Sequence, residues 1–316
     1  MKNFALLISP SAKNAFFHDY LDVARAELAW LIGHTEITHT KVSAMDFFEI
    51  WISEDLLPRL TSLSFLHGVF ERQGEQLIPL PVATPFGLDE DFVFGAKFKG
   101  KTNELLTQLL INVGLRSIDY RSVADVKLLD PMCGRATTLL WAMRYGMKAK
   151  GIEQDGKALT DIRQNVKKWC KVHRQKHQFT EGFVGKSNKQ QVGKFVDFAA
   201  NGASMRVICG DSVEASSLLK GERFDLLVSD LPYGVQHFTT SRTRNPLKVV
   251  TASAAGWVDS LKSGGVIVLA FNSYLPKREE LLAAFTEYGM QVLNFSAAHR
   301  MSESIVRDVV ILKKTG

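Results

Sequence analysis

Four acidic residues in the last two thirds of the 316-residue sequence stand at or just after the end of a short apolar run. They are Asp130, Glu153, Asp211 and Asp230. Helix-like segments separate the runs, which is typical of parallel strands whose carboxyl ends meet at one edge of a sheet. Carboxylates at that edge can accept hydrogen bonds from ligand hydroxyl and amino groups. The alternative for each acid is the N-cap of the helix that follows.

The first acid opens the segment Asp-Pro-Met-Cys-Gly-Arg-Ala-Thr-Thr at 130–138, between a predicted strand and a predicted helix. Such a turn directs backbone amides and a helix N-terminus at a ligand. Gly134 and Ala136 allow the backbone to approach closely, although Ala136 stands where Gly usually closes such loops. The segment supplies five candidate cofactor-binding residues, Asp130, Cys133, Gly134, Ala136 and Thr137.

Glu153 lies 23 residues after Asp130, where a carboxylate can accept hydrogen bonds from ribose hydroxyls. This placement fits a nicotinamide cofactor as well as S-adenosylmethionine. Asp211, with Ser212 after it, is placed to accept a hydrogen bond from an adenine amino group. We add Glu153, Asp211 and Ser212 to the cofactor-binding candidates.

The last acid begins the tetrad Asp230-Leu231-Pro232-Tyr233. The tetrad resembles the (Asp/Asn)-Pro-Pro-(Tyr/Phe) signature of methyltransferases that act on exocyclic amines, so S-adenosylmethionine is the better cofactor. By this resemblance Asp230 and the Leu231 carbonyl accept the two amine hydrogens, Pro232 stiffens the turn, and Tyr233 stacks on the extruded base. Leu231 stands where the first Pro is usual.

The chain from 96 to 316 resembles the tRNA guanosine-N2 methyltransferases, which often carry a THUMP RNA-binding domain. The stretch Lys-Phe-Lys-Gly-Lys-Thr-Asn at 97–103 is similar to the one before the cofactor loop in that family, which makes Thr102 a further cofactor-binding candidate. The resemblance implies methylation of guanosine N2 in tRNA. It leaves open the oligomeric state and the need for a small activator subunit.

The formal charge of +6 is unevenly distributed along the chain. Residues 1–100 hold 8 Lys and Arg against 13 Asp and Glu, a net −5, whereas residues 101–316 hold 31 against 20, a net +11. Residues 162–180 contain six Lys and Arg and no acid, and positions 163, 167, 171 and 174 are predicted to share one helical face. RNA phosphates are the expected partner, although a solvated helix face is equally compatible. The candidate substrate-binding residues are Lys167, Lys171, Arg242 and Arg244.

Other activities also fit these motifs. The tetrad occurs in DNA adenine and cytosine amino methyltransferases and in glutamine methyltransferases of release factors, so it indicates the reaction and not the polymer. The departures at Ala136 and Leu231 also suit an inactive cofactor-binding scaffold.

The pattern predicts an α/β protein in two parts. Residues 1–95 form a small α+β domain with a strand at 4–9, a helix at 20–32 and an apolar segment at 47–52. Residues 96–316 form a class I methyltransferase domain, a Rossmann-like sheet of seven strands whose last strand enters antiparallel. The predicted strands are 127–130, 149–153, 205–209, 225–230, 266–271, 291–296 and 306–313, and the helices are 103–113, 137–145, 159–172, 252–262 and 278–288.

Composition is that of an ordinary globular protein, with 46% hydrophobic and 23% charged residues. The three cysteines, Cys133, Cys170 and Cys209, are far apart and form no metal-binding motif, so no metal site is expected. The apolar run at the N-terminus is too short for a secretion signal, and no run has the length of a membrane span. We expect a cytoplasmic protein without a membrane partner.

Overall fold

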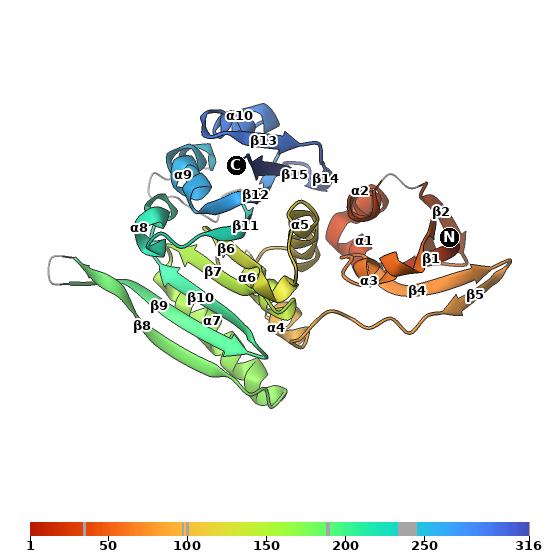
Figure 1. Cartoon of the computed structure of the whole chain (residues 1–316), viewed down its shortest axis with the longest axis horizontal. Coiled ribbons are helices and arrows are strands. Elements are labelled where there is room, and N and C mark those ends of the chain that lie inside the picture. Colours follow the sequence, from red (N-terminus) through yellow and green to blue (C-terminus); the bar gives the residue numbers. More distant parts are fainter. Residues whose placement is uncertain (34–35, 97, 99–100, 188–189, 233–244, 316) are drawn as a thin grey trace.

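The computed structural model describes residues 1–33, 36–96, 98, 101–187, 190–232 and 245–315, and for 186, 187, 190 and 191 only the backbone. The larger sheet has the strand order β13-β15-β12-β11-β6-β7-β10-β9-β8, and β14 (His299–Ser302) pairs with β15 (Figure 1). Strands β6, β7, β10, β11 and β12 are parallel, and β15 is antiparallel to both of its neighbours β12 and β13. The predicted arrangement of seven strands with an antiparallel last strand is therefore confirmed, as part of a larger sheet of ten described strands. Its strands are β6 (Lys127–Asp130), β7 (Lys148–Glu153), β10 (Ala203–Cys209), β11 (Phe224–Asp230), β12 (Leu261–Asn272), β13 (Met290–Leu293) and β15 (Ile305–Lys314).

Helices cover both faces of this sheet, and alternate residues of each central strand pack against opposite layers. Leu128 and Leu226 belong to the core under one set of helices, whereas Leu129 and Leu227 belong to the core under the other. A strand that is buried on both sides reads as a continuous apolar run, which is why these strands could be located in the sequence. One layer holds α5 (Glu104–Arg116), α6 (Thr137–Arg144) and α7 (Gly156–Val172), and the other holds α8 (Ala215–Leu219), α9 (Leu247–Asp259) and α10 (Arg278–Ala283).

Some predicted boundaries are wrong. The helix expected at 252–262 ends at Asp259, and β12 already begins at Leu261, five residues before the expected start. The helix expected at 278–288 ends at Ala283 and is followed by a separate 3-10 turn at Thr286–Tyr288. Arg174 lies outside α7, in a left-handed conformation with φ 50°, so it does not share the helical face of Lys167 and Lys171.

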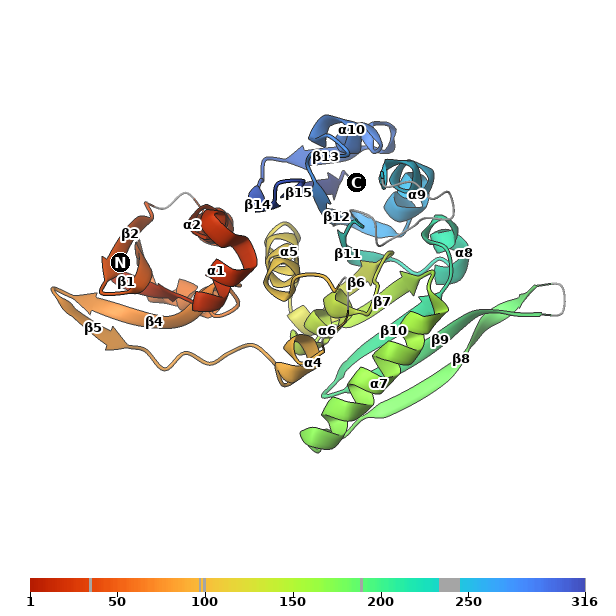
Figure 2. The same cartoon turned by 180° about the vertical axis from the view of Figure 1, so that it is seen from behind.

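A long hairpin was not predicted. Strands β8 (Gln178–Ser187) and β9 (Gln190–Ala200) pair antiparallel, and β9 adds to the edge of the sheet beside β10. Figures 1 and 2 show the hairpin extending well beyond the rest of the sheet. Its outer half is rich in Gly, Lys and Gln and lacks the continuous apolar run by which the central strands were recognised.

The N-terminal part forms a five-stranded antiparallel sheet of order β2-β3-β1-β4-β5. Its elements are β1 (Lys2–Ile8), α1 (Pro10–Phe16), α2 (Tyr20–Ile32), β2 (Thr38–Val42), β3 (Met45–Ile52), α3 (Leu57–Leu60), β4 (Leu66–Gln73) and β5 (Gln76–Pro79). The predicted mixed α+β character is confirmed. The predicted domain boundary at residue 95 falls between the short α4 (Asp91–Phe94) and α5.

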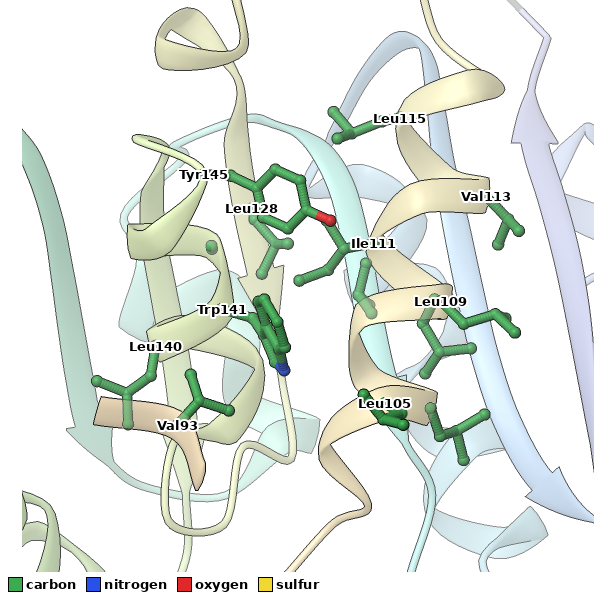
Figure 3. Close-up of a cluster of buried hydrophobic side chains, with 14 of the residues drawn as sticks. Val93, Leu105, Leu109, Ile111, Val113, Leu115, Leu128, Leu140, Trp141 and Tyr145 are labelled. Carbon is green, nitrogen blue, oxygen red and sulfur yellow. The ribbon is translucent and has the colours of Figure 1, made fainter. Parts of the chain in front are cut away.

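Helix α5 lies between the two sheets (Figure 1) and is buried along its whole middle, from Leu105 to Leu115. Figure 3 shows Ile111 pointing toward Tyr145 and Leu128 of the larger sheet's layer, whereas Val113 points away from them. The indole Nε1 of Trp30 on α2 donates to the backbone carbonyl of Val113 at 3.1 Å. The two parts of the chain therefore pack against one shared helix. Among the described residues, no helix combines the length and apolarity needed to cross a membrane.

A buried polar network crosses this interface. The Glu27 carboxylate on α2 accepts hydrogen bonds from the Ser64 amide and hydroxyl and, at 2.6 Å, from Asn112 Nδ2 on α5. The Tyr145 hydroxyl donates to Asn112 Oδ1 at 2.5 Å. Burial raises the pKa of Glu27 to about 7, although Ser64 and Asn112 donate to its carboxylate.

We expect the Glu27 carboxyl to make stability depend on pH. Its folded-state pKa of about 7 lies above the ordinary value of 4.5, so the folded chain binds the proton more tightly and loses stability as pH rises between these values. The loss should approach about 3 kcal/mol, and Glu27→Gln should remove it. Urea unfolding at pH 5 and pH 8 measures both proteins, and an equal pH dependence in the two would contradict the expectation.

Candidate functional site

The carboxyl ends of the central parallel strands meet at one edge of the sheet, as the sequence predicted. Asp130 pairs in register with Gly151, and Glu153 pairs with Cys209 of β10. Asp230 ends β11 on the other side of β6, and the Ser229 hydroxyl beside it donates to Asp130 Oδ1 at 2.8 Å. The structure therefore brings the strand-end acids together on adjacent strands.

The loop after β6 is held against β7 by backbone hydrogen bonds. The Cys133 amide donates to the Ile152 carbonyl at 3.0 Å, and the Ala136 amide donates to the Cys133 carbonyl at 2.8 Å. The Gly134 amide donates to Glu153 Oε2 at 2.9 Å. These bonds fix the turn before α6 and orient it toward the edge of the sheet.

Asp130 faces the protein interior, with 2% of its surface exposed. Burial raises the pKa of Asp130 to about 6, although the Thr138 and Ser229 hydroxyls and the Met132 amide donate to its carboxylate. The side chain thereby ties the start of the loop to β11. Cys133 is buried next to it, and burial raises the pKa of its thiol.

Glu153 accepts hydrogen bonds from two segments, the loop after β6 and the turn after β7. Its Oε2 accepts from Gly134, and its Oε1 accepts from the Asp155 amide at 2.8 Å. Each carboxylate oxygen carries a second lone pair, so both can still accept from ligand hydroxyls. The ribose contact stays a prediction, and the two amide donors supply the orientation that it needs.

Two residues of the loop adopt left-handed backbone conformations. Gly134 has φ 52°, and a Cβ built on it would meet no atom within 4 Å, which leaves the backbone open to a ligand. Ala136 has φ 66° and is completely buried at the N-cap of α6, a conformation that favours Gly over Ala. Ala136 therefore adopts the turn conformation that Gly usually takes at this position, and a left-handed alanine costs conformational free energy. Thr137, at 4% exposure, begins α6 directly after it, and Thr102 lies in the segment that enters α5.

Gly151 was missed in the sequence. A Cβ at this position would lie 2.6 Å from Cys133 Sγ and 2.8 Å from Cys133 Cβ, so only glycine lets the loop sit on β7. A glycine inside an otherwise regular strand is the sequence signal for such a close approach.

Asp211 performs the alternative role named for these acids. Its Oδ1 accepts from the Val213 amide at 3.0 Å and caps the 3-10 turn Ser212–Glu214. Ser212 is 7% exposed. Capping by one oxygen leaves the other oxygen for the predicted adenine contact, which stays a prediction.

The first residue of the tetrad is paired with a buried arginine. The Asp230 side chain is 6% exposed and forms an ion pair with Arg307 of β15. The Leu231 amide donates to the Ala270 carbonyl at 2.9 Å, a bond that proline could not make, and its side chain is buried. Pro232 is half-buried. Tyr233, Arg242 and Arg244 lie outside the described residues.

The cations of α7 divide into two groups. Arg163 pairs with Glu181 at 3.1 Å, and His173 pairs with Asp91 and Asp89 from the segment before α5. Lys167 instead lies over the Phe179 ring of β8, with Nζ 5.2 Å from the centroid, and Lys171 is exposed. The ligand atoms of Asp89, Asp91 and His173 lie within 4.8 Å of one another, and the His173 ring shares a hydrogen bond of 3.0 Å with Asp91.

Comparison with known proteins finds solved structures that superpose on much of this chain at low sequence identity. No family model and no curated protein matches the sequence. TrmN from Thermus thermophilus superposes with a TM-score of 0.49 at 13% identity, over 99% of this chain and 100% of that one. A methyltransferase from Pyrococcus furiosus gives 0.42 at 15% identity, over 72% and 93%. The 16S rRNA N2 methyltransferase RsmC from T. thermophilus, solved with AdoMet and guanosine, gives 0.40 at 17%, over 94% and 62%. The assignment of the fold therefore rests on the strand order of this chain.

We expect Gly151→Ala to destabilise the protein because the new methyl would overlap Cys133. Overpacking of this kind costs about 1–3 kcal/mol. Gly185→Ala is the matched control, since Gly185 also lies in a strand and its Cβ position is open. Urea unfolding measures both variants, and an equal loss in the two would remove the special role of Gly151.

Proposed function

We propose that the protein is an S-adenosylmethionine-dependent methyltransferase that modifies an exocyclic amine of an RNA base, with guanosine N2 in tRNA as the favoured target. The observation that carries the proposal is the Asp230 carboxylate, at the carboxyl end of β11 and one strand away from the loop of Gly134. The class I sheet order and the resemblance of the tetrad support it.

The cofactor residues fit a nucleoside with an aliphatic sulfonium chain. Glu153 is fixed by two amides and can accept from ribose hydroxyls, and the open side of Gly134 lets the backbone approach the ligand. Asp211 and Ser212 follow the neighbouring strand β10, where an adenine would lie next to the ribose. When bound, S-adenosylmethionine supplies an electrophilic methyl group.

The residues of the tetrad prepare the amine. Asp230 accepts one amine hydrogen and the Leu231 carbonyl accepts the other, which holds the nitrogen lone pair in line with the methyl carbon. The oriented amine nitrogen would take the methyl group that the bound cofactor supplies, with the thioether as the leaving group. The extra amine proton leaves to Asp230 or to water. Pro232 limits the motion of this turn.

RNA is the favoured polymer because the surplus of positive charge lies in residues 101–316. Lys167 and Lys171 remain available on α7 for phosphate contacts, and Arg242 and Arg244 follow the tetrad in the sequence. DNA or a protein glutamine would present a similar amine to the same tetrad. Mass spectrometry of nucleosides from tRNA, rRNA and DNA of a strain that lacks this protein distinguishes the polymers.

The roles of Asp230 and Glu153 can be separated by mutation. We expect Asp230→Ala to lower transfer by at least about 100-fold while the affinity for S-adenosylmethionine changes little. Glu153→Ala should weaken cofactor binding by about 10-fold or more, because it removes the ribose acceptor and the support of the loop. Calorimetric titration and transfer of labelled methyl to bulk tRNA measure the two effects. Wild-type turnover in Asp230→Ala would refute the assignment, and cofactor binding without transfer to any polymer would indicate a scaffold.

A further inference from the structure

Arg307 of β15 contacts Asp230, the first residue of the tetrad, from a strand far along the chain. Its surface is completely buried, and it forms an ion pair with the Asp230 carboxylate. Burial lowers the pKa of Arg307 to about 9, so the guanidinium is still charged at neutral pH. A desolvated carboxylate remains ionised in such a place only with a charged or hydrogen-bonding partner.

The sheet holds Arg307 firmly at this position. Strand β12 lies between β11 and β15, and Asp230 pairs with Ala270 while Arg307 pairs with Asn272. The arginine side chain therefore reaches across β12 to Asp230. The next residue, Asp308, pairs with Arg278 at 2.8 Å and accepts from the Ser296 hydroxyl at 2.8 Å.

The N-terminal part supports the same strand. His299 of β14 (His299–Ser302) is the cross-strand partner of Arg307. The buried His299 ring packs edge-on against Phe16 of α1, with centroids 5.1 Å apart, and the Arg300 amide donates to Asp19 at 2.6 Å. A continuous set of packed residues thus joins α1 to the carboxylate.

We propose that Arg307 is a positioning residue that holds the Asp230 carboxylate ionised and in one orientation, and that Phe16 supports it through His299. This inference rests on the proposed methyl transfer at Asp230. One carboxylate oxygen binds the guanidinium, which leaves the other to accept the amine hydrogen. A protonated carboxyl could not accept in the same way.

The charged neighbours of Asp230 make the effect of Arg307 testable by pH. Among the described residues, Asp130 of β6 accepts from the hydroxyl of Ser229, which precedes Asp230, Arg307 of β15 pairs with Asp230, and Asp308 is engaged with Arg278. Without Arg307, the buried carboxylate beside Asp130 would take up a proton at higher pH. Activity would then be lost at a pH where the wild type is still active.

The test compares Arg307→Lys and Arg307→Met with the wild type in transfer to bulk tRNA between pH 5.5 and 9.5. We expect Arg307→Met to lower kcat by about 100-fold at pH 7 and to move the acid limb of the profile up by about one pH unit or more. Arg307→Lys should restore the position of the limb, with KM and cofactor affinity nearly unchanged in both. An unchanged limb and kcat in Arg307→Met would overturn the proposal.

A second measurement does not depend on activity. If Asp230 and Arg307 stabilise each other, Arg307→Met and Asp230→Asn should each lower the urea midpoint, and the double variant should recover part of the loss. Additive losses would overturn the pairing of Asp230 with Arg307, whether or not the protein transfers a methyl group. A wild type that transfers no methyl group would refute only the proposed function. If Arg307→Met does not fold, the pH profiles of Arg307→Lys and Phe16→Ala test the proposal in its place.

The support from α1 has a matched control. Phe16 and Phe47 are both buried phenylalanines of the N-terminal part, but Phe47 packs against Phe70. We expect Phe16→Ala to move the acid limb of the pH profile to higher pH, as Arg307→Met does, and Phe47→Ala to leave it in place. An equal effect of the two variants would remove the role of Phe16.

A separate observation concerns the β8–β9 hairpin. The last pair between β9 and β10 is formed by Phe195 and Ile208. Five residues of β9, 190–194, lie beyond this pair and extend about 16 Å past the edge of the sheet that carries the site. Of the described side chains between 192 and 196, Lys194 is exposed and none is acidic. Phe183 is 43% exposed and pairs with the exposed Lys194.

The hairpin and α7 form one surface. Alternate residues of β8 share a face, so Phe183 follows Phe179 and Glu181, which contact Lys167 and Arg163 of α7. We infer that this surface, from Lys171 along β8 to Phe183 and Lys194, binds unpaired substrate RNA through phosphate contacts and base stacking. This inference rests on RNA being the substrate of the proposed function.

Binding can be measured without transfer. We expect Phe183→Ala/Lys194→Ala to bind bulk tRNA about 10-fold more weakly and to reduce the salt slope of the affinity by about one. Trp51→Ala/Lys41→Ala removes an exposed aromatic residue and an exposed lysine from the N-terminal sheet and serves as the control. Unchanged RNA affinity in the first variant, or an equal loss in the control, would overturn the assignment.

Discussion

The burial of α5 on all sides is the constraint on which the rest of the molecule depends. A helix buried from Leu105 to Leu115 needs an apolar layer on each side, and here one layer comes from α6 and the larger sheet while the other comes from α2. Its few polar side chains must find partners in the interior. Asn112 does so with Glu27, Tyr145 and the Ser62 carbonyl, which joins the two parts of the chain.

This packing reaches the site through β14. Because α5 fixes α2, it also fixes α1 and the adjoining turn, where Phe16 and Asp19 contact His299 and Arg300. The N-terminal part therefore contacts the β14–β15 pair, to which Arg307 belongs. In this view it contributes to the ionisation of Asp230 in addition to any contact with substrate.

The acids at the carboxyl edge show how one residue type is used for different tasks. Asp130 is buried and ties the loop to β11, Glu153 holds the loop from outside, and Asp211 caps a turn. Asp230 differs because its partner is a cation from a distant strand. Helix-capping roles and ligand-binding roles coexist at this edge because a carboxylate has two oxygens with four lone pairs.

The sequence by itself determined where the central strands lie along the chain, the loop after β6 and the acids at the strand ends. These features depend on apolar runs and turn residues that are neighbours along the chain, so they can be located without knowledge of contacts. The two departures, at Ala136 and Leu231, could be located in the same way, whereas the left-handed conformation of Ala136 and the hydrogen bond of the Leu231 amide came from the structure.

Only the tertiary structure decided which polar groups meet. The pairs of Asp230 with Arg307, Glu27 with Asn112 and His173 with Asp91 join residues more than seventy positions apart. Their partners depend on strand register and on helix packing, which no local pattern encodes. The same reason explains why the acid-free stretch 162–180 proved partly neutralised by acids from elsewhere, and why the hairpin at the edge of the sheet was not predicted.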